Sequence, residues 1–116
     1  MHIEDIQAIC HKHKGVTEDI KWEDHLCFSV GDKMFLVTAP DNVPPTASIK
    51  VSDEAFESLP TRKGFIPAPY MARHKWILCE DSALVSPEKF EYLATNSYNL
   101  VKAKLPKKLQ KELESL

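Results

Sequence analysis

The residues best suited to chemistry are two short basic runs on either side of a proline-rich segment. The runs together contain Arg62, Lys63, Arg73, His74 and Lys75. Tyr70 lies within the segment, and Trp76 directly follows the second run. Cations beside aromatic rings suit contacts with phosphates and unstacked bases. We therefore predict a nucleic-acid-binding surface here, if the loop brings the two runs together. The alternative is a solvated loop whose charges serve solubility.

Two further lysines join this candidate surface. Lys33 and Lys50 fall on predicted strands, at positions that we expect to project from the open face of a sheet. A separate lysine cluster ends the chain, and it comprises Lys102, Lys104, Lys107, Lys108 and Lys111. Lysines suit the C-terminal end of a helix, where they complement its dipole. We interpret that cluster as an ordinary solvated helix end.

Residue spacing provides little support for catalysis or metal binding. His11 and His13 are two positions apart on a predicted helix, so their side chains do not share a face. No HExxH motif or pair of closely spaced cysteines is present. Cys27 and Cys79 lie among apolar residues of predicted strands, which favours burial over a nucleophilic role. We expect no catalytic residue, no metal and no cofactor, and we expect that the protein is not an enzyme.

Glycine content excludes the common phosphate-binding loops. The chain of 116 residues has only three glycines, Gly15, Gly31 and Gly64, so neither a Walker loop nor a dinucleotide-binding GxGxxG can be formed.

Composition indicates one ordinary globular domain that spans residues 1–116. Apolar residues make up 43% of the chain, and the net charge of −2 is not typical of a dedicated nucleic-acid-binding domain. No run approaches the roughly 20 apolar residues of a membrane-spanning helix, and the first residues lack the pattern of a signal peptide. We therefore expect a cytoplasmic protein without membrane contact. Its odd number of widely spaced cysteines predicts free, buried thiols.

The elements that must position these residues follow from hydrophobic periodicity. Apolar residues at helical spacing predict a helix over residues 3–13. Alternating apolar and polar residues then predict strands over residues 19–24, 25–30, 33–38 and 46–52, with residues 61–65 in a loop. A fifth strand is predicted over residues 74–79. Both faces of this strand carry apolar residues, which indicates a central position in the sheet.

Helix signals complete the predicted architecture. Ser52 is expected to cap a short helix that Pro60 limits, and Ser86 with Pro87 begins a long one that Pro106 ends. A terminal helix is expected over residues 107–116, with Leu109 and Leu113 facing inward. The sequence thus predicts an α+β fold: an antiparallel sheet of about five strands, with N-terminal and C-terminal helices packed on one face.

Four motifs, in order, resemble the MmcQ/YjbR family. They are GDKMF at residues 31–35, SIK at 48–50, PAPYMARHKW at 67–76 and SYNLVKAKLP at 97–106. The resemblance covers nearly the whole chain. In the family, an aromatic–glycine pair often follows the first strand. This chain reads IKWED there instead, so we expect its first hairpin to turn differently.

The resemblance implies a CyaY-like α+β fold and a DNA-binding role, the label commonly given to this family. Among the matching positions, Lys33, Lys50, Tyr70 and Trp76 are the candidates for a binding surface. DNA is then the expected partner. The alternative is a domain that binds an unidentified protein or a small ligand, without nucleic-acid binding.

Overall fold

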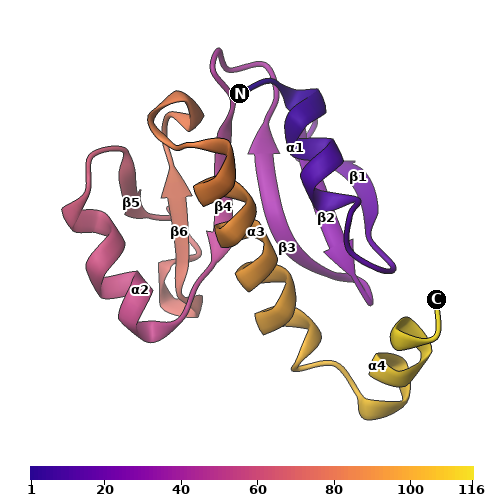
Figure 1. The fold of residues 1–116 in the computed structure, drawn as a ribbon. Helices are drawn as coiled ribbons and strands as arrows, with labels where there is room; N and C mark the ends of the chain where they lie inside the picture. The colour runs from indigo at the N-terminus through magenta and orange to yellow at the C-terminus, as the bar shows by residue number, and fades with distance from the viewer.

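The computed structural model describes residues 1–116 as one mixed sheet-and-helix body (Figure 1). Six antiparallel strands lie in the order β1-β2-β3-β4-β6-β5. The strands are β1 (Thr17–Lys21), β2 (His25–Val30), β3 (Lys33–Ala39), β4 (Thr46–Lys50), β5 (Phe65–Pro67) and β6 (Trp76–Cys79). The α-helices are α1 (Ile3–Cys10), α2 (Asp53–Ser58), α3 (Pro87–Lys102) and α4 (Lys107–Glu114). Short 3-10 turns are η1 (Leu59–Thr61), η2 (Ala72–His74) and η3 (Ser82–Leu84).

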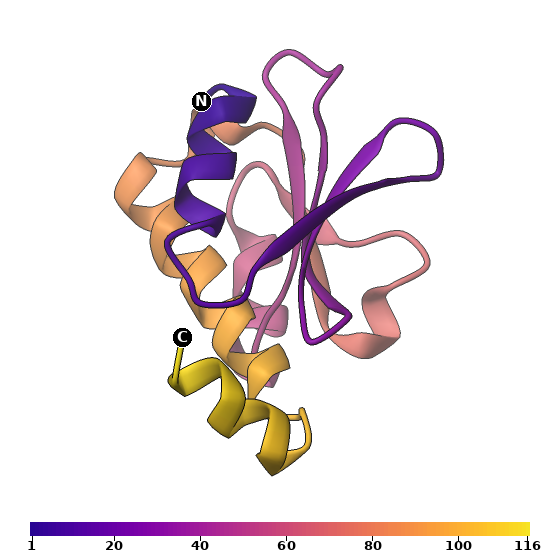
Figure 2. The ribbon, with the colours of Figure 1, turned by 90° about the vertical axis from the view of Figure 1, so that its right-hand side faces the viewer.

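The helices α1 and α3 cover one face of the sheet, and this arrangement confirms the predicted fold class (Figure 2). The main core of 22 buried residues lies between these layers. Leu113 of α4 is buried in this core and Leu109 packs against it, as predicted. None of the helices combines the length and hydrophobicity that crossing a bilayer would require.

The sheet has one strand more than predicted. Residues 61–65 were expected in a loop, but Phe65 begins β5 and pairs with Cys79 of β6. A strand of three residues is too short to show alternation, and pairing with β6 is what stabilises it. The predicted central position of β6 is confirmed, since it lies between β4 and β5. Ile77 belongs to the main core, whereas Trp76 belongs to a smaller cluster on the other face.

The first hairpin departs from the prediction of a strand over residues 19–24. The strand β1 ends at Lys21, and Trp22 and Glu23 form the turn with positive φ angles of 51° and 69°. Ile20 and Trp22 are both exposed, and so are all five residues of β1. The turn is thus made without glycine.

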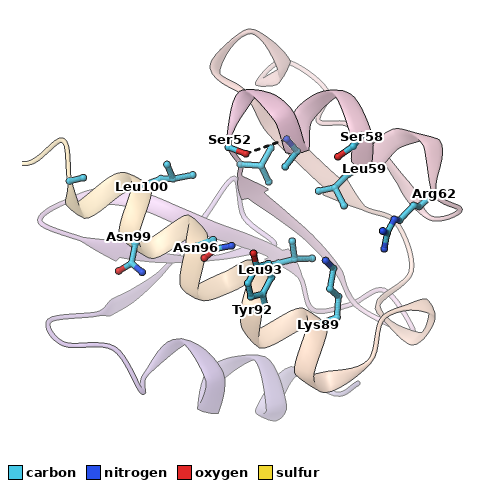
Figure 3. A pocket seen from close by; sticks show the side chains of 13 residues that line it. Ser52, Ser58, Leu59, Arg62, Lys89, Tyr92, Leu93, Asn96, Asn99 and Leu100 are labelled. Carbon is cyan, nitrogen blue, oxygen red and sulfur yellow. Dashed lines mark hydrogen bonds between the residues drawn. The ribbon is translucent and has the colours of Figure 1, made fainter.

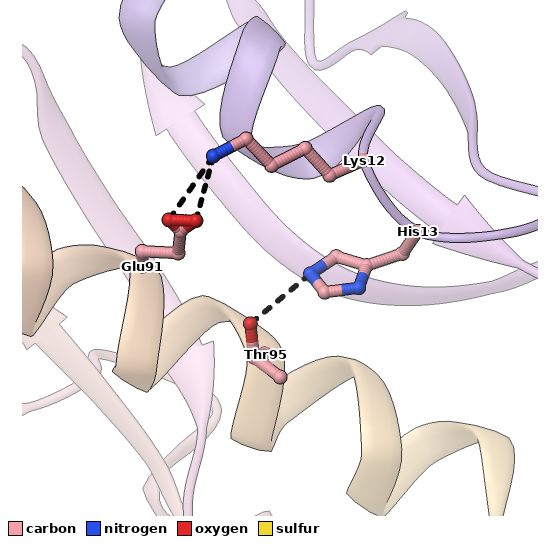
Figure 4. A network of polar contacts seen from close by, with 4 residues as sticks. All are labelled: Lys12, His13, Glu91 and Thr95. Carbon is pink, nitrogen blue, oxygen red and sulfur yellow. Dashed lines mark hydrogen bonds and ion pairs between the residues drawn. The ribbon is translucent and has the colours of Figure 1, made fainter.

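The first helix is shorter than predicted, because it ends at Cys10 and the chain then turns toward α3 (Figure 4). Lys12 contacts Glu91 at 2.7 Å, and the His13 ring lies 3.2 Å from the Thr95 hydroxyl. The same ring stacks on Tyr98 with centroids 4.7 Å apart. These contacts fasten the first helix to the long one.

All three thiols are free and buried, as predicted. Burial and the nearby Glu18 carboxylate raise the pKa of Cys10 to about 12. The thiol of Cys10 therefore stays protonated at neutral pH, which suits a packing role.

Candidate nucleic-acid interface

The structure divides the predicted basic grouping into two separate parts. Phe65 lies opposite Cys79 and Pro67 opposite Ile77, because β5 and β6 are antiparallel. Arg62 and Lys63 therefore lie at the Cys79 end of β6. The run Arg73–Lys75 precedes Trp76, at the other end. The expectation that the loop brings both runs together is wrong, since a strand separates them.

The second run meets both strand lysines at one end of the sheet. Lys50, the last residue of β4, donates a hydrogen bond of 2.9 Å from its Nζ to the His74 carbonyl oxygen. Lys33 begins β3, and the antiparallel pairing of β3 with β4 places it at the same end. Arg73 and His74 are exposed there.

A further lysine from the long helix region adds charge at this end. Desolvation by the surrounding protein lowers the pKa of Lys50, the positive charge of Lys104 lowers it further, and Asp53 opposes both. Lys104 was interpreted as part of a solvated helix end. No local pattern relates it to Lys50, which is 54 positions earlier, and only the packing of α3 on the sheet brings their charges close.

Lys75 is partly committed to holding the fold. Its backbone is left-handed, with φ of 64°, and closes the turn η2. Its Nζ lies 4.9 Å from the ring centroid of Phe56 in α2, at cation–π distance. Lys75 therefore links the loop to α2 and is only half-exposed.

The two aromatic candidates lie in opposite environments. Trp76 is only 5% exposed and packs with Cys27, Val37 and Ala68. Its ring is not available to stack on a base, so the structure removes it from the candidate surface. Tyr70 is fully exposed, whereas its neighbour Met71 packs against the Trp76 cluster.

The loop that carries Tyr70 is folded back on the sheet by backbone hydrogen bonds. The Ala68 amide donates to the Trp76 carbonyl at 3.0 Å, and the Met71 amide donates to the Ala68 carbonyl at 3.2 Å. Tyr70 thus projects from a closed loop. We use the name basic edge for this surface, which comprises Lys33, Lys50, Tyr70, Arg73, His74 and Lys104.

The arrangement of side chains offers little support for a metal site or for a histidine–carboxylate catalytic pair. No three His, Cys, Asp or Glu side chains are grouped so that they could hold a metal ion. The His11 ring contacts the Glu18 carboxylate at 2.7 Å, a surface pair between α1 and β1. The basic edge can offer cations and one aromatic ring to an anionic partner.

Comparison with known proteins places the chain among small domains of this architecture. The sequence model of the YjbR family matches residues 11–100. A crystal structure of a Deinococcus radiodurans protein with a DUF419 domain superposes with a TM-score of 0.89, at 26% identity over 97% of this chain and 88% of that one. A Pseudomonas syringae structure gives a TM-score of 0.72 at 21% identity, over 87% of this chain and 99% of that one, and shows the shared fold alone. No curated protein matches the chain.

Proposed function

The chain belongs to the YjbR family, and on that premise we propose that it is a small, non-catalytic binding module that contacts DNA through the basic edge. The observation that carries the proposal is Tyr70, fully exposed on a closed loop that also bears Arg73. An exposed ring beside cations matches the chemistry of single-strand binding, in which bases stack on aromatics and cations neutralise phosphates. The proposal therefore favours single strands over duplex.

The charges of the basic edge support the same proposal. None of its cations takes part in an ion pair, since the three pairs of the protein are His11–Glu18, Lys12–Glu91 and His25–Asp24. The net charge of the chain is −2, so attraction to phosphate must come from this local concentration of lysine and arginine. We expect weak binding that depends strongly on salt.

A fluorescence titration tests this proposal. Labelled single-stranded and duplex DNA are titrated with protein at about 50 mM salt, and the single strand is repeated at rising salt concentration. The double variant Arg73→Ala/Lys104→Ala should weaken single-strand binding. It should also reduce the slope of log affinity against log salt concentration by about 1.4, because fewer counterions are released when two phosphate contacts are lost.

The double variant Lys63→Ala/Lys108→Ala is the matched control, since it removes the same charge from exposed positions outside the basic edge. It should bind as the native protein does. Absence of binding at near-millimolar protein would refute the proposal. Equal loss in both double variants would show that the basic edge is the wrong surface.

A further inference from the structure

A groove of about 460 Å³ lies between α2 and α3 (Figure 3). Its volume falls within the range of about 300–1,000 Å³ that is usual for small-molecule sites. Val51, Leu59 and Leu93 form an apolar floor, and each of them is less than a tenth exposed. The floor can therefore desolvate the apolar part of a ligand.

The walls of the groove carry small and polar side chains. No residue of α2 is fully buried, and α2 presents the small Ala55 to the groove. On the opposite wall, α3 presents Asn96 and Asn99, whose side chains are exposed. Both amides are therefore free for a ligand.

Two cations approach the groove from its opposite walls. Arg62 follows η1 and Lys89 lies in the first turn of α3, and Figure 3 shows their side chains at the same end. Lys89 is half-buried, with its Nζ 5.1 Å from the ring centroid of Tyr92. Neither cation is in an ion pair.

The charge of the groove differs from that of the whole protein. The chain has 17 acidic residues and 15 lysines and arginines, yet the lining contains Arg62 and Lys89 and no Asp or Glu. A guanidinium can hold a carboxylate with two parallel hydrogen bonds, and an ammonium can add a third. The polar end of the groove is therefore complementary to an anion.

We propose that this groove binds a small amphipathic carboxylate. The carboxylate lies between Arg62 and Lys89, the apolar body covers Leu59 and Leu93, and Asn96 can hydrogen-bond to a polar group farther along. This site is independent of the proposed nucleic-acid contact, because it shares no residue with the basic edge.

An NMR titration with octanoate tests the site, with the isotope-labelled full chain observed through its amide signals. Octanoate should cause saturable shifts at the Asn96 side-chain amide and at the Leu93 backbone amide. Octanamide has the same chain without the charge, and acetate has the charge without the chain. Both should bind at least ~10-fold more weakly, because each lacks one half of the complementarity.

Two matched variants test whether Arg62 is the residue that binds the carboxylate. Arg62→Met should weaken octanoate binding by ~10-fold or more, whereas Lys63→Met, which also removes one positive charge but lies outside the groove, should leave it unchanged. Ala55→Leu should block binding by filling the groove. Since Arg62 is exposed, its variant should keep the native spectrum.

Three results would overturn the proposal. Equal affinity for octanamide would mean that the groove has no preference for an anion. Equal affinity in Arg62→Met would place the anion elsewhere. Octanoate shifts that do not saturate, or that fall outside the groove, would mean that no site exists there.

Discussion

The Ser97 hydroxyl of α3 accepts a hydrogen bond of 2.9 Å from the backbone amide of Lys50. It also donates one of 2.5 Å to the carbonyl of Phe35. Phe35 is an extra residue in β3, because its neighbours Leu36 and Met34 pair with consecutive residues of β2. Such a bulge interrupts the strand ladder. Ser97 thus satisfies two backbone groups at the interruption and joins the long helix to the sheet.

Replacement of Ser97 by alanine should therefore be costly. Ser97 is fully buried, so Ser97→Ala leaves the Lys50 amide and the Phe35 carbonyl without this partner in a site that excludes water. We expect a loss of about 1–3 kcal/mol in the free energy of unfolding, measured by urea denaturation. Ser115→Ala is the control, since that exposed hydroxyl donates only to Glu112 near the C-terminus and its loss should cost less than about 0.5 kcal/mol. Equal effects of the two substitutions would contradict this role.

Acidification should weaken the contact between the first helix and the long one. Burial against α3 lowers the pKa of His13 below its ordinary 6.5, Lys12 lowers it further, and Glu91 opposes both. The unfolded chain then binds a proton before the folded one does. His13 therefore contributes full stability above pH 6.5, and this contribution is lost as the pH falls through the folded-state pKa.

Urea denaturation at a series of pH values from about 7.5 down to about 5 checks this expectation. His13→Gln should flatten the decline below pH 6.5, because the titrating group is gone. His74→Gln, at an exposed position of the basic edge, is the control and should retain the decline. If the His13 variant kept the native pH profile, another group would be responsible.

Tyr70 of the loop and Trp76 of β6 should separate binding from stability. Trp76→Ala should cost about 3–5 kcal/mol, because it empties the cluster on the outer face of the sheet. Tyr70→Ala should change stability by less than about 0.5 kcal/mol, since the ring is fully exposed. Thermal unfolding measures both effects.

Tyr70→Ala should nevertheless weaken single-strand binding by about 1–3 kcal/mol, the usual value of one base–aromatic stack. The same titration with duplex should respond less, because paired bases are not free to stack. A variant that binds single strands as tightly as the native protein would remove Tyr70 from the interface.

Local patterns in the sequence determined the layers of the fold. Apolar residues on both faces predicted that β6 is central, and helical spacing predicted the inward side of α4, including Leu113. The three thiols were predicted to be free and buried, and they are. These features follow from the sequence because side-chain periodicity decides which side of an element faces the core.

Only the tertiary structure decided which residues meet. Strand register separated Arg62 from Arg73, and helix packing brought Lys104 near Lys50 and Arg62 near Lys89. Periodicity likewise could not show that Trp76 is covered while Tyr70 is exposed. Contacts between residues distant in sequence depend on strand register and on how the elements pack. Neither produces a periodic pattern in the sequence. The sequence therefore specified the elements and their buried sides, and packing chose the members of each surface.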